Sequence, residues 1–213
     1  MPETAAQTPG KSRHRLAPSA RRGLIQEAAT RVFAERGYEA ATMQEIARMA
    51  GVVASVLYDH YPSKRELYTG LLEEHGKKLM KRTIRAPRGK DPKAELRRQI
   101  DDFLRAIETD PFVWRMLFRD PPVDPKIAAA HRRVQDEATE AIAEALGTAA
   151  AKTQSIGGSS TTPQTVVAAE MVKSSLIGLA AWWWEHREIS REDLVSTATT
   201  LLWGGISRIG QPV

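Results

Sequence analysis

The chain has 213 residues, of which 42% are hydrophobic and 27% charged, which is ordinary for a globular protein large enough to bury a core. It has no cysteine, which excludes disulfides and thiolate metal sites and favours a reducing cytoplasm. Residues 1–100 hold 20 Lys and Arg against 11 Asp and Glu, a net charge of +9, whereas residues 101–213 hold 11 against 15, a net charge of −4. A basic N-terminal half is typical of a polyanion-binding module, although chance clustering on solvated surfaces produces the same asymmetry.

The first elements are a tail and one long helix. Residues 1–17 are predicted to be a flexible basic tail, because they mix proline, glycine and basic residues without helical periodicity. A helix is predicted from Pro18, since apolar residues then recur at helical spacing. Gly37 is expected to end it in a left-handed conformation. The apolar face of this helix consists of Leu24, Ile25, Ala28, Ala29, Val32 and Phe33.

Three short segments follow. A second helix is predicted from Thr42, which forms a Thr-x-x-Glu capping box with Glu45. Gly51 interrupts the chain, and a third helix is predicted over Ala54–Tyr61. Ser63 opens a fourth helix with a second capping box. Two short helices joined by a tight glycine turn are a helix-turn-helix pattern, although many all-α proteins contain such a pair.

The rest of the chain is also predicted to be helical. Residues 75–90 carry seven Lys and Arg and no acid, and we interpret them as a joint between two regions. Residues 147–163 are predicted to be a loop because they are rich in Gly, Ser, Thr and Ala. No segment alternates as a strand does, so the predicted fold class is all-α. The predicted helices are Pro92–Thr109, Pro111–Arg119, Asp124–Leu146, Gln164–Trp184 and Arg191–Ile209.

The longest apolar stretch, Leu176–Trp184, is shorter than the roughly 20 residues that a bilayer requires, and residues 1–10 lack a signal-peptide core. We therefore expect a soluble cytoplasmic protein that does not contact a membrane.

Several local runs carry a family resemblance. They are VFAERGY from Val32, ATMQEIA from Ala41, AGV from Ala50 and LYDHYPSK from Leu57. Together they resemble the N-terminal domain of the TetR family of bacterial transcriptional regulators. The resemblance implies a DNA-binding domain over residues 18–78, with the helix-turn-helix at about 41–61, followed by a helical ligand-binding and dimerisation domain over 79–213.

The resemblance also implies roles in DNA binding. Thr42 would donate its hydroxyl to a phosphate, and Tyr58 would contact a phosphate or a base edge. His60 and Lys64 would hold the DNA backbone. Val53 and Ala54 differ from the polar or basic residues of many family members, and they can touch a thymine methyl but cannot hydrogen-bond a base. We therefore expect weak direct readout, with DNA shape and the basic tail contributing more, or simply moderate affinity. The predicted DNA-binding residues are Arg21, Arg22, Thr42, Val53, Ala54, Ser55, Tyr58, Asp59, His60 and Lys64.

The second region is predicted to bind a small molecule and a second subunit. Aromatic residues at helical spacing either line a cavity or form ordinary core. We expect an apolar or aromatic effector. The candidate pocket residues are Phe103, Trp114, Leu117, Phe118, Met171 and Trp183. The candidate dimer contacts are Val167, Ile177, Trp182, Leu202 and Ile206.

No catalytic or metal-binding pattern is present. The five histidines have no ligand spacing, and no phosphate loop or nucleophile motif occurs. We predict no enzyme activity, no cofactor and no metal. The predicted function is a homodimeric repressor that a small ligand releases from a palindromic DNA operator. The alternatives are an activator, a weakly specific DNA binder, or a helical ligand-binding protein that has lost operator binding.

Overall fold

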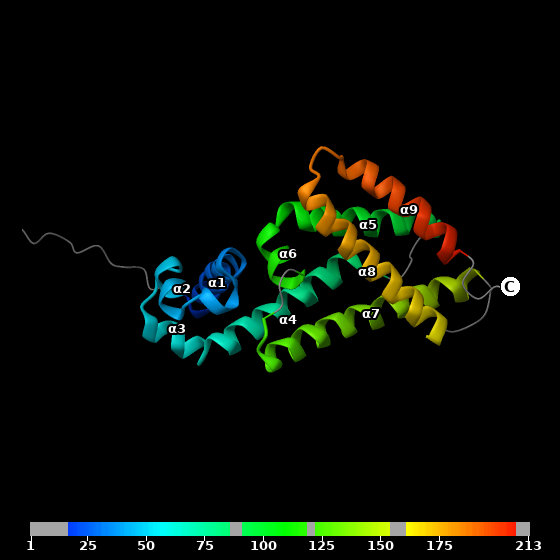
Figure 1. The fold of residues 1–213 in the computed structure, drawn as a ribbon. Helices are drawn as coiled ribbons and strands as arrows, with labels where there is room; N and C mark the ends of the chain where they lie inside the picture. The colour runs from blue at the N-terminus through cyan, green and yellow to red at the C-terminus, as the bar shows by residue number, and fades with distance from the viewer. Residues whose placement is uncertain (1–16, 86–90, 119–121, 154–160, 208–213) are drawn as a thin grey trace, which may run out of the picture.

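The computed structural model describes residues 17–85, 91–118, 122–153 and 161–207, and within them it contains nine α-helices and no strand (Figure 1). The predicted all-α fold class is therefore confirmed. The helices are α1 (Pro18–Ala40), α2 (Met43–Met49), α3 (Ala54–His60), α4 (Lys64–Thr83), α5 (Pro92–Thr109), α6 (Pro111–Phe118), α7 (Pro125–Thr153), α8 (Pro163–Glu185) and α9 (Arg191–Ile206).

The ends of the first three helices follow the local chemistry of the sequence. Gly37 has a φ of 74° and interrupts α1 where the sequence predicts its end. Thr42 caps α2 by accepting a hydrogen bond from the Glu45 amide at 3.2 Å. The reciprocal half of that capping box does not form, because the Glu45 carboxylate instead pairs with Arg36 at 3.1 Å. Gly51, with a φ of 68°, makes the turn between α2 and α3.

The end of α7 differs from the prediction. Helix α7 continues to Thr153, so the predicted loop begins several residues too early. Gly147 is buried inside this helix. Helix α4 runs without a break to Thr83, so the proposed division at 78/79 falls inside a continuous helix. The predicted tail up to residue 16 and the predicted end of the last helix at Ile209 lie outside the described residues.

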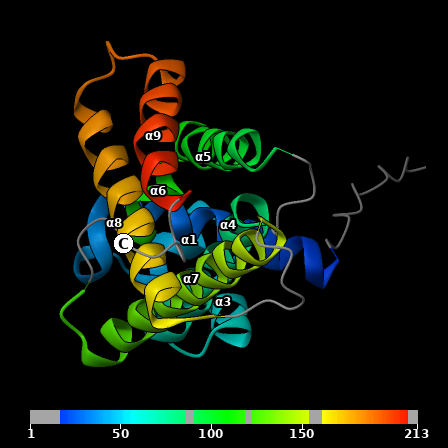
Figure 2. The ribbon, with the colours of Figure 1, turned by 90° about the vertical axis from the view of Figure 1, so that its right-hand side faces the viewer.

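The helices bury two apolar clusters. The first joins α1–α4 to α6 and α7, and it includes Phe33, Leu57 and Ile127. The second joins α5, α6, α8 and α9 around Trp114 and Trp183. Figure 1 shows α1–α3 at one end of the molecule and α5, α8 and α9 at the other, with α4 running from one group to the other. Figure 2, viewed from the far end, shows α8 and α9 lying next to each other, with α8 crossing α7. Helix α4 therefore links the two ends, because it continues the chain from α3 and packs against both α1 and α5.

Helices α4 and α7 approach each other most closely at Gly76. A Cβ atom at this position would lie 2.6 Å from Cγ1 of Val134. We expect Gly76→Ala to lower the free energy of unfolding by about 1–3 kcal/mol, because the short, branched Val134 side chain leaves little room to move. Gly70→Ala in the same helix is the matched control. Its Cβ would meet nothing within 4 Å, so a gain of about 0.5–1 kcal/mol is expected. Equal urea-unfolding shifts for the two variants would contradict the close contact.

Two imidazoles, the buried His131 and the half-buried His75, tie α4 to neighbouring helices. His131 on α7 lies 3.2 Å from the Tyr68 hydroxyl, and His75 lies 2.8 Å from the Thr30 hydroxyl on α1. Burial lowers the pKa of both histidines, and burial raises the pKa of Tyr68 to about 12. All three groups are therefore neutral in the folded protein at pH 7.

This neutrality makes stability depend on pH. An unfolded histidine has a pKa near 6.5, so below about pH 6.5 the unfolded chain takes up protons that the folded protein does not. Stability is thus fully present above that pH and falls on acidification, by at most about 1.4 kcal/mol per pH unit for each imidazole. Urea unfolding at pH 7.5, 6.5 and 5.5 measures the slope. His131→Gln should make it shallower, and an unchanged slope would show that His131 plays no part.

Candidate nucleic-acid interface and ligand cavity

The third helix presents a mixed polar and apolar surface to solvent. Leu57 is fully buried and anchors α3 against the first cluster. Ser55, Tyr58 and Asp59 are exposed, and Val53, just before the helix, has 65% of its surface exposed. Ala54 and His60 are half-buried. The predicted DNA-contacting residues of α3 therefore lie at the solvent-exposed surface of one short helix. A recognition helix that enters the major groove needs such an exposed surface.

Two further predicted contacts lie beside this helix. Thr42 is exposed, and its hydroxyl oxygen accepts the capping bond, so its proton is available to a phosphate. The Arg22 guanidinium lies over the Tyr61 ring at 5.5 Å, which brings the start of α1 beside the end of α3. Arg21, one residue earlier, is half-buried. Sequence reasoning did not include Gln44 and Arg48, which are exposed on α2.

The structure gives Lys64 a different environment from the one that the family resemblance implies. Its ammonium group donates to the carbonyl oxygens of Tyr38 (2.8 Å), Glu39 (3.2 Å) and Ala41 (3.0 Å). It also lies 4.4 Å from the centre of the Tyr38 ring. These three acceptors use all three ammonium protons. Lys64 therefore ties the end of α1 to the start of α4, and a phosphate contact would require it to give up one of these bonds.

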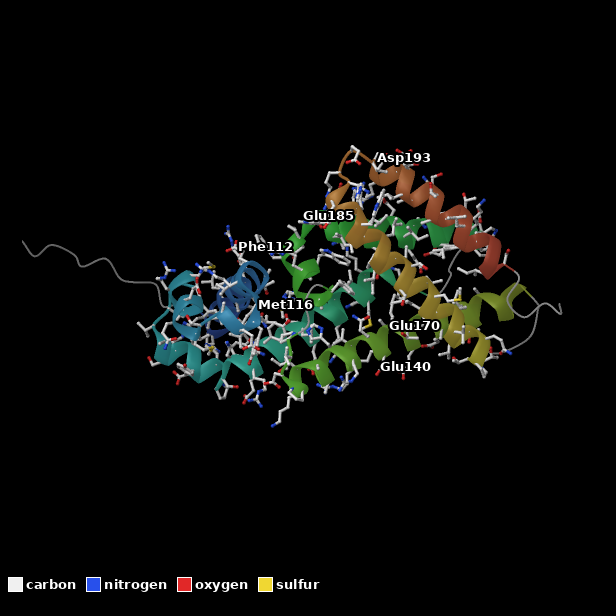
Figure 3. All side chains as sticks on the ribbon, viewed as in Figure 1. Phe112, Met116, Glu140, Glu170, Glu185 and Asp193 are labelled. Carbon is white, nitrogen blue, oxygen red and sulfur yellow. The ribbon has the colours of Figure 1, made fainter. Side chains whose placement is uncertain are left out.

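Helix α6 packs against α1 and thereby connects the end formed by α1–α3 to the rest of the molecule. Figure 3 shows Phe112 and Met116 on α6, beside α1 and α4. The Arg31 guanidinium on α1 lies 5.4 Å from the centre of the Phe112 ring, and the Tyr68 hydroxyl donates to the Met116 carbonyl at 3.5 Å. A displacement of α6 or α4 would therefore directly change the contacts of α1.

An apolar cavity lies between α4, α5, α7 and α8. Its volume is about 120 Å³. Its walls are mostly aliphatic, and the aromatic contribution is limited to Phe103 and Phe118. Lys173 lines it, but its ammonium is already paired with Glu170 at 2.7 Å and donates to Thr139 at 2.7 Å. The cavity therefore suits a long aliphatic group better than a charged one.

The predicted pocket residues separate in the structure. Phe103, Leu117 and Phe118 line the cavity, whereas Trp114 lines only a neighbouring one. Met171 lies on the outer surface, and Trp183 is buried core whose indole nitrogen donates to the Ile189 carbonyl at 2.8 Å. The aromatic character of these residues alone could not show which of them line the cavity and which belong to the buried core. The aliphatic wall of α4 was missed, although its residues recur at helical spacing: Leu79, Met80, Thr83 and Ile84.

The last two helices leave an apolar surface uncovered. Val167, Met171 and Trp182 on α8 are 60%, 65% and 46% exposed, and Leu201 on α9 is 73% exposed. Gly178 lies between them on α8 with open space around it. The predicted contact Leu202 is half-buried. Ile177 and Ile206 instead line the cavity.

The apolar stretch Leu176–Trp184 is too short to span a bilayer, but it is only part of the longer helix α8. This helix has 23 residues, a mean hydropathy of 1.3 in its most apolar window, and only 22% of that window buried. Length and composition alone would thus permit a membrane span. The neighbouring α9 has its own exposed leucine, so the apolar surface extends across two helices, as an interface between helices does.

Within the part of the chain that the structure describes, no group of three or more His, Asp or Glu side chains is placed to hold a metal ion.

Comparisons with known proteins agree with this arrangement. Residues 25–71 match the family described as "Bacterial regulatory proteins, tetR family", and residues 79–212 match "Tetracyclin repressor-like, C-terminal domain". The transcriptional activator FasR of Mycolicibacterium smegmatis is 31% identical over 198 residues, which cover 92% of this chain and 87% of FasR.

Two solved structures share the fold. A TetR-like transcriptional regulator from Rhodococcus sp. RHA1 superimposes with a TM-score of 0.71 at 22% identity, covering 91% of this chain and 99% of its own. FadR from Bacillus subtilis, in complex with stearoyl-CoA, superimposes with a TM-score of 0.69 at 18% identity, covering 88% of this chain and 99% of FadR. The family matches and FasR point to a DNA-binding regulator and not to an enzyme, as the sequence predicts. The chain belongs to the TetR family of transcriptional regulators.

Proposed function

We propose that this protein is a homodimeric regulator that binds a palindromic operator and is released from it when a long-chain aliphatic ligand occupies the cavity. The observation that carries the proposal is that α4 both lines the cavity and begins directly after the exposed helix α3. The DNA-binding domain would span residues 18–78, and the ligand-binding and dimerisation domain would span 79–213. The two would share α4 across their boundary.

The uncovered surface of α8 and α9 supports a dimer. An exposed Met171 or Leu201 costs solvation free energy that a matching surface on a second copy would recover. Small residues such as Gly178 permit close approach of the paired helices. A two-fold axis here would present two copies of α3 to DNA, with half-sites one turn, about 34–36 Å, apart, or farther if the operator is longer.

Of the apolar or aromatic ligands that the sequence suggests, the walls of the cavity favour an aliphatic one. A protein of the same fold, FadR from Bacillus subtilis, has been crystallised with stearoyl-CoA. An acyl chain of that kind matches the aliphatic lining, and its polar headgroup would remain at the mouth. Filling the cavity would displace α4 or α6, and both contact α1.

Ligand release can be tested by fluorescence anisotropy with an operator selected from a random pool. Stearoyl-CoA is expected to weaken DNA binding about 5- to 150-fold. Ala138→Trp fills the cavity from α7, so by the same displacement this variant should bind the operator weakly even without ligand and should not respond to stearoyl-CoA. Wild-type protein that binds stearoyl-CoA with unchanged operator affinity would contradict ligand release.

The direction of regulation has a second candidate. FasR, which matches along 92% of this chain, is named an activator, so activation of transcription competes with the predicted repression. A promoter-reporter assay with the selected operator separates them, because loss of the regulator raises expression under repression and lowers it under activation.

A further inference from the structure

The position that begins the recognition helix lacks the side-chain cap that precedes most of the other helices, and only Ala17, before α1, shares this lack among the N-cap residues described. Thr42, Ser63, Asp91, Thr162 and Ser190 each precede a helix and accept a hydrogen bond from a backbone amide three residues later. The corresponding residue of α3 is Val53, which makes no such bond. Valine is among the poorest residues at this position, and replacing a capping side chain by an apolar one typically costs about 0.5–2 kcal/mol.

Within the described part of the subunit, no packing of the Val53 side chain compensates for the missing cap. The Val53 side chain does not pack into the core, since 65% of its surface is exposed. Its backbone is well placed, with φ −77° and ψ 152°, and its carbonyl accepts from the amides of Val56 (3.1 Å) and Leu57 (3.3 Å). The side chain is therefore held at a fixed position in solvent. A residue that contributes neither a cap nor packing at an ordered position indicates a contact outside the subunit.

The surroundings define what that contact can be. Ser55 and Asp59, four residues apart, share the outward surface of α3, and both are exposed. The Asp59 carboxylate would repel a phosphate, so this surface fits base edges better than the DNA backbone. An isopropyl group can recognise only an apolar feature of a base edge. In the major groove, that feature is the C5 methyl group of thymine.

We propose that Val53 is a specificity-determining residue that reads a thymine methyl group in each half-site of the operator. The neighbouring Ala54 widens the apolar contact. In place of weak direct readout, this assignment gives Val53 one specific base contact. It rests on the proposed binding to a specific operator. Exposed valines also occur singly on surfaces without a function, and the missing cap together with the fixed backbone distinguishes Val53 from those.

The test uses deoxyuridine, which lacks only the methyl group of thymine. In the selected operator, each thymine is replaced singly and then at symmetry-related pairs, and affinities are measured by anisotropy. At one position in each half-site the loss is expected to be about 4-fold, and about 15-fold when both half-sites are changed, as burial of a methyl group predicts. In Val53→Ala, deoxyuridine at that position should cost little or nothing. Val56→Ala is the matched control and should retain the full sensitivity.

A second variant tests the capping argument independently of DNA. Val53→Ser restores a capping oxygen, so its melting temperature should rise by about 2–4 °C while its sensitivity to deoxyuridine disappears. An operator that is insensitive to deoxyuridine at every position, or a sensitivity that survives in Val53→Ala, would overturn the assignment to Val53. If no sequence is enriched from the random pool at all, operator binding itself is wrong, which is a separate failure.

Discussion

Replacing Met171 and Leu201 together by lysine is expected to convert the protein to a monomer and to weaken operator binding by at least about 100-fold. The two side chains are 65% and 73% exposed on α8 and α9, in the apolar surface that we assign to the dimer. Four lysines brought together across a two-fold axis would repel each other and lose hydration. DNA affinity falls steeply because a monomer binds one half-site without the effective concentration that the second subunit supplies.

Sedimentation and anisotropy measure the two effects separately. Val123→Lys is the matched control, since Val123 is 91% exposed, is also apolar, and lies before α7 and outside the α8–α9 surface. This variant should remain dimeric and bind the operator as the wild type does. A Met171→Lys/Leu201→Lys protein that stays dimeric would place the interface elsewhere.

Lys64→Ala is expected to lower the free energy of unfolding by about 2 kcal/mol, because it leaves three carbonyl oxygens at the end of α1 without their donor. DNA affinity should also fall, as the position of α1 against α4 loosens. The dependence of binding on salt should stay unchanged, because no phosphate contact is lost.

Lys77→Ala supplies the control for the loss of one positive charge in the same helix. Lys77 is exposed, and no hydrogen bond or ion pair involves it in the described structure. Its removal should leave stability within about 0.5 kcal/mol of the wild type. If Lys64→Ala is as stable as Lys77→Ala while its salt slope falls by about one, Lys64 is the phosphate contact that the family resemblance implies.

Local sequence chemistry predicts the DNA-binding end well, because its signals are short-range. The cap at Thr42, the turn at Gly51 and the stop at Gly37 each depend on residues within a few positions. The end of α7 could not be found in this way. Gly147 usually favours a break, but here it is buried in a helix whose neighbours on both sides are good helix formers.

The functional surfaces depend on long-range packing, and this limits prediction. Trp114 and Trp183 are aromatic, as the residues that line a ligand pocket often are, but they pack in the second apolar cluster. Lys64 has the family's position for a phosphate contact, yet only the folded chain brings the carbonyl of Tyr38 within 2.8 Å of it. Met171 appears as an ordinary helical apolar residue until the structure shows that the described residues leave 65% of its surface exposed.

Sequence-selective binding by a dimer is the central claim, and selection of duplex DNA from a random pool tests it most directly. The enriched sequence is titrated by anisotropy at two salt concentrations and compared with random duplex of equal length. A palindromic site bound by one dimer, and at least about 1,000-fold more tightly than random duplex, is the predicted result. Binding that enriches no sequence and collapses equally with salt on every duplex would contradict the claim and leave only electrostatic attraction.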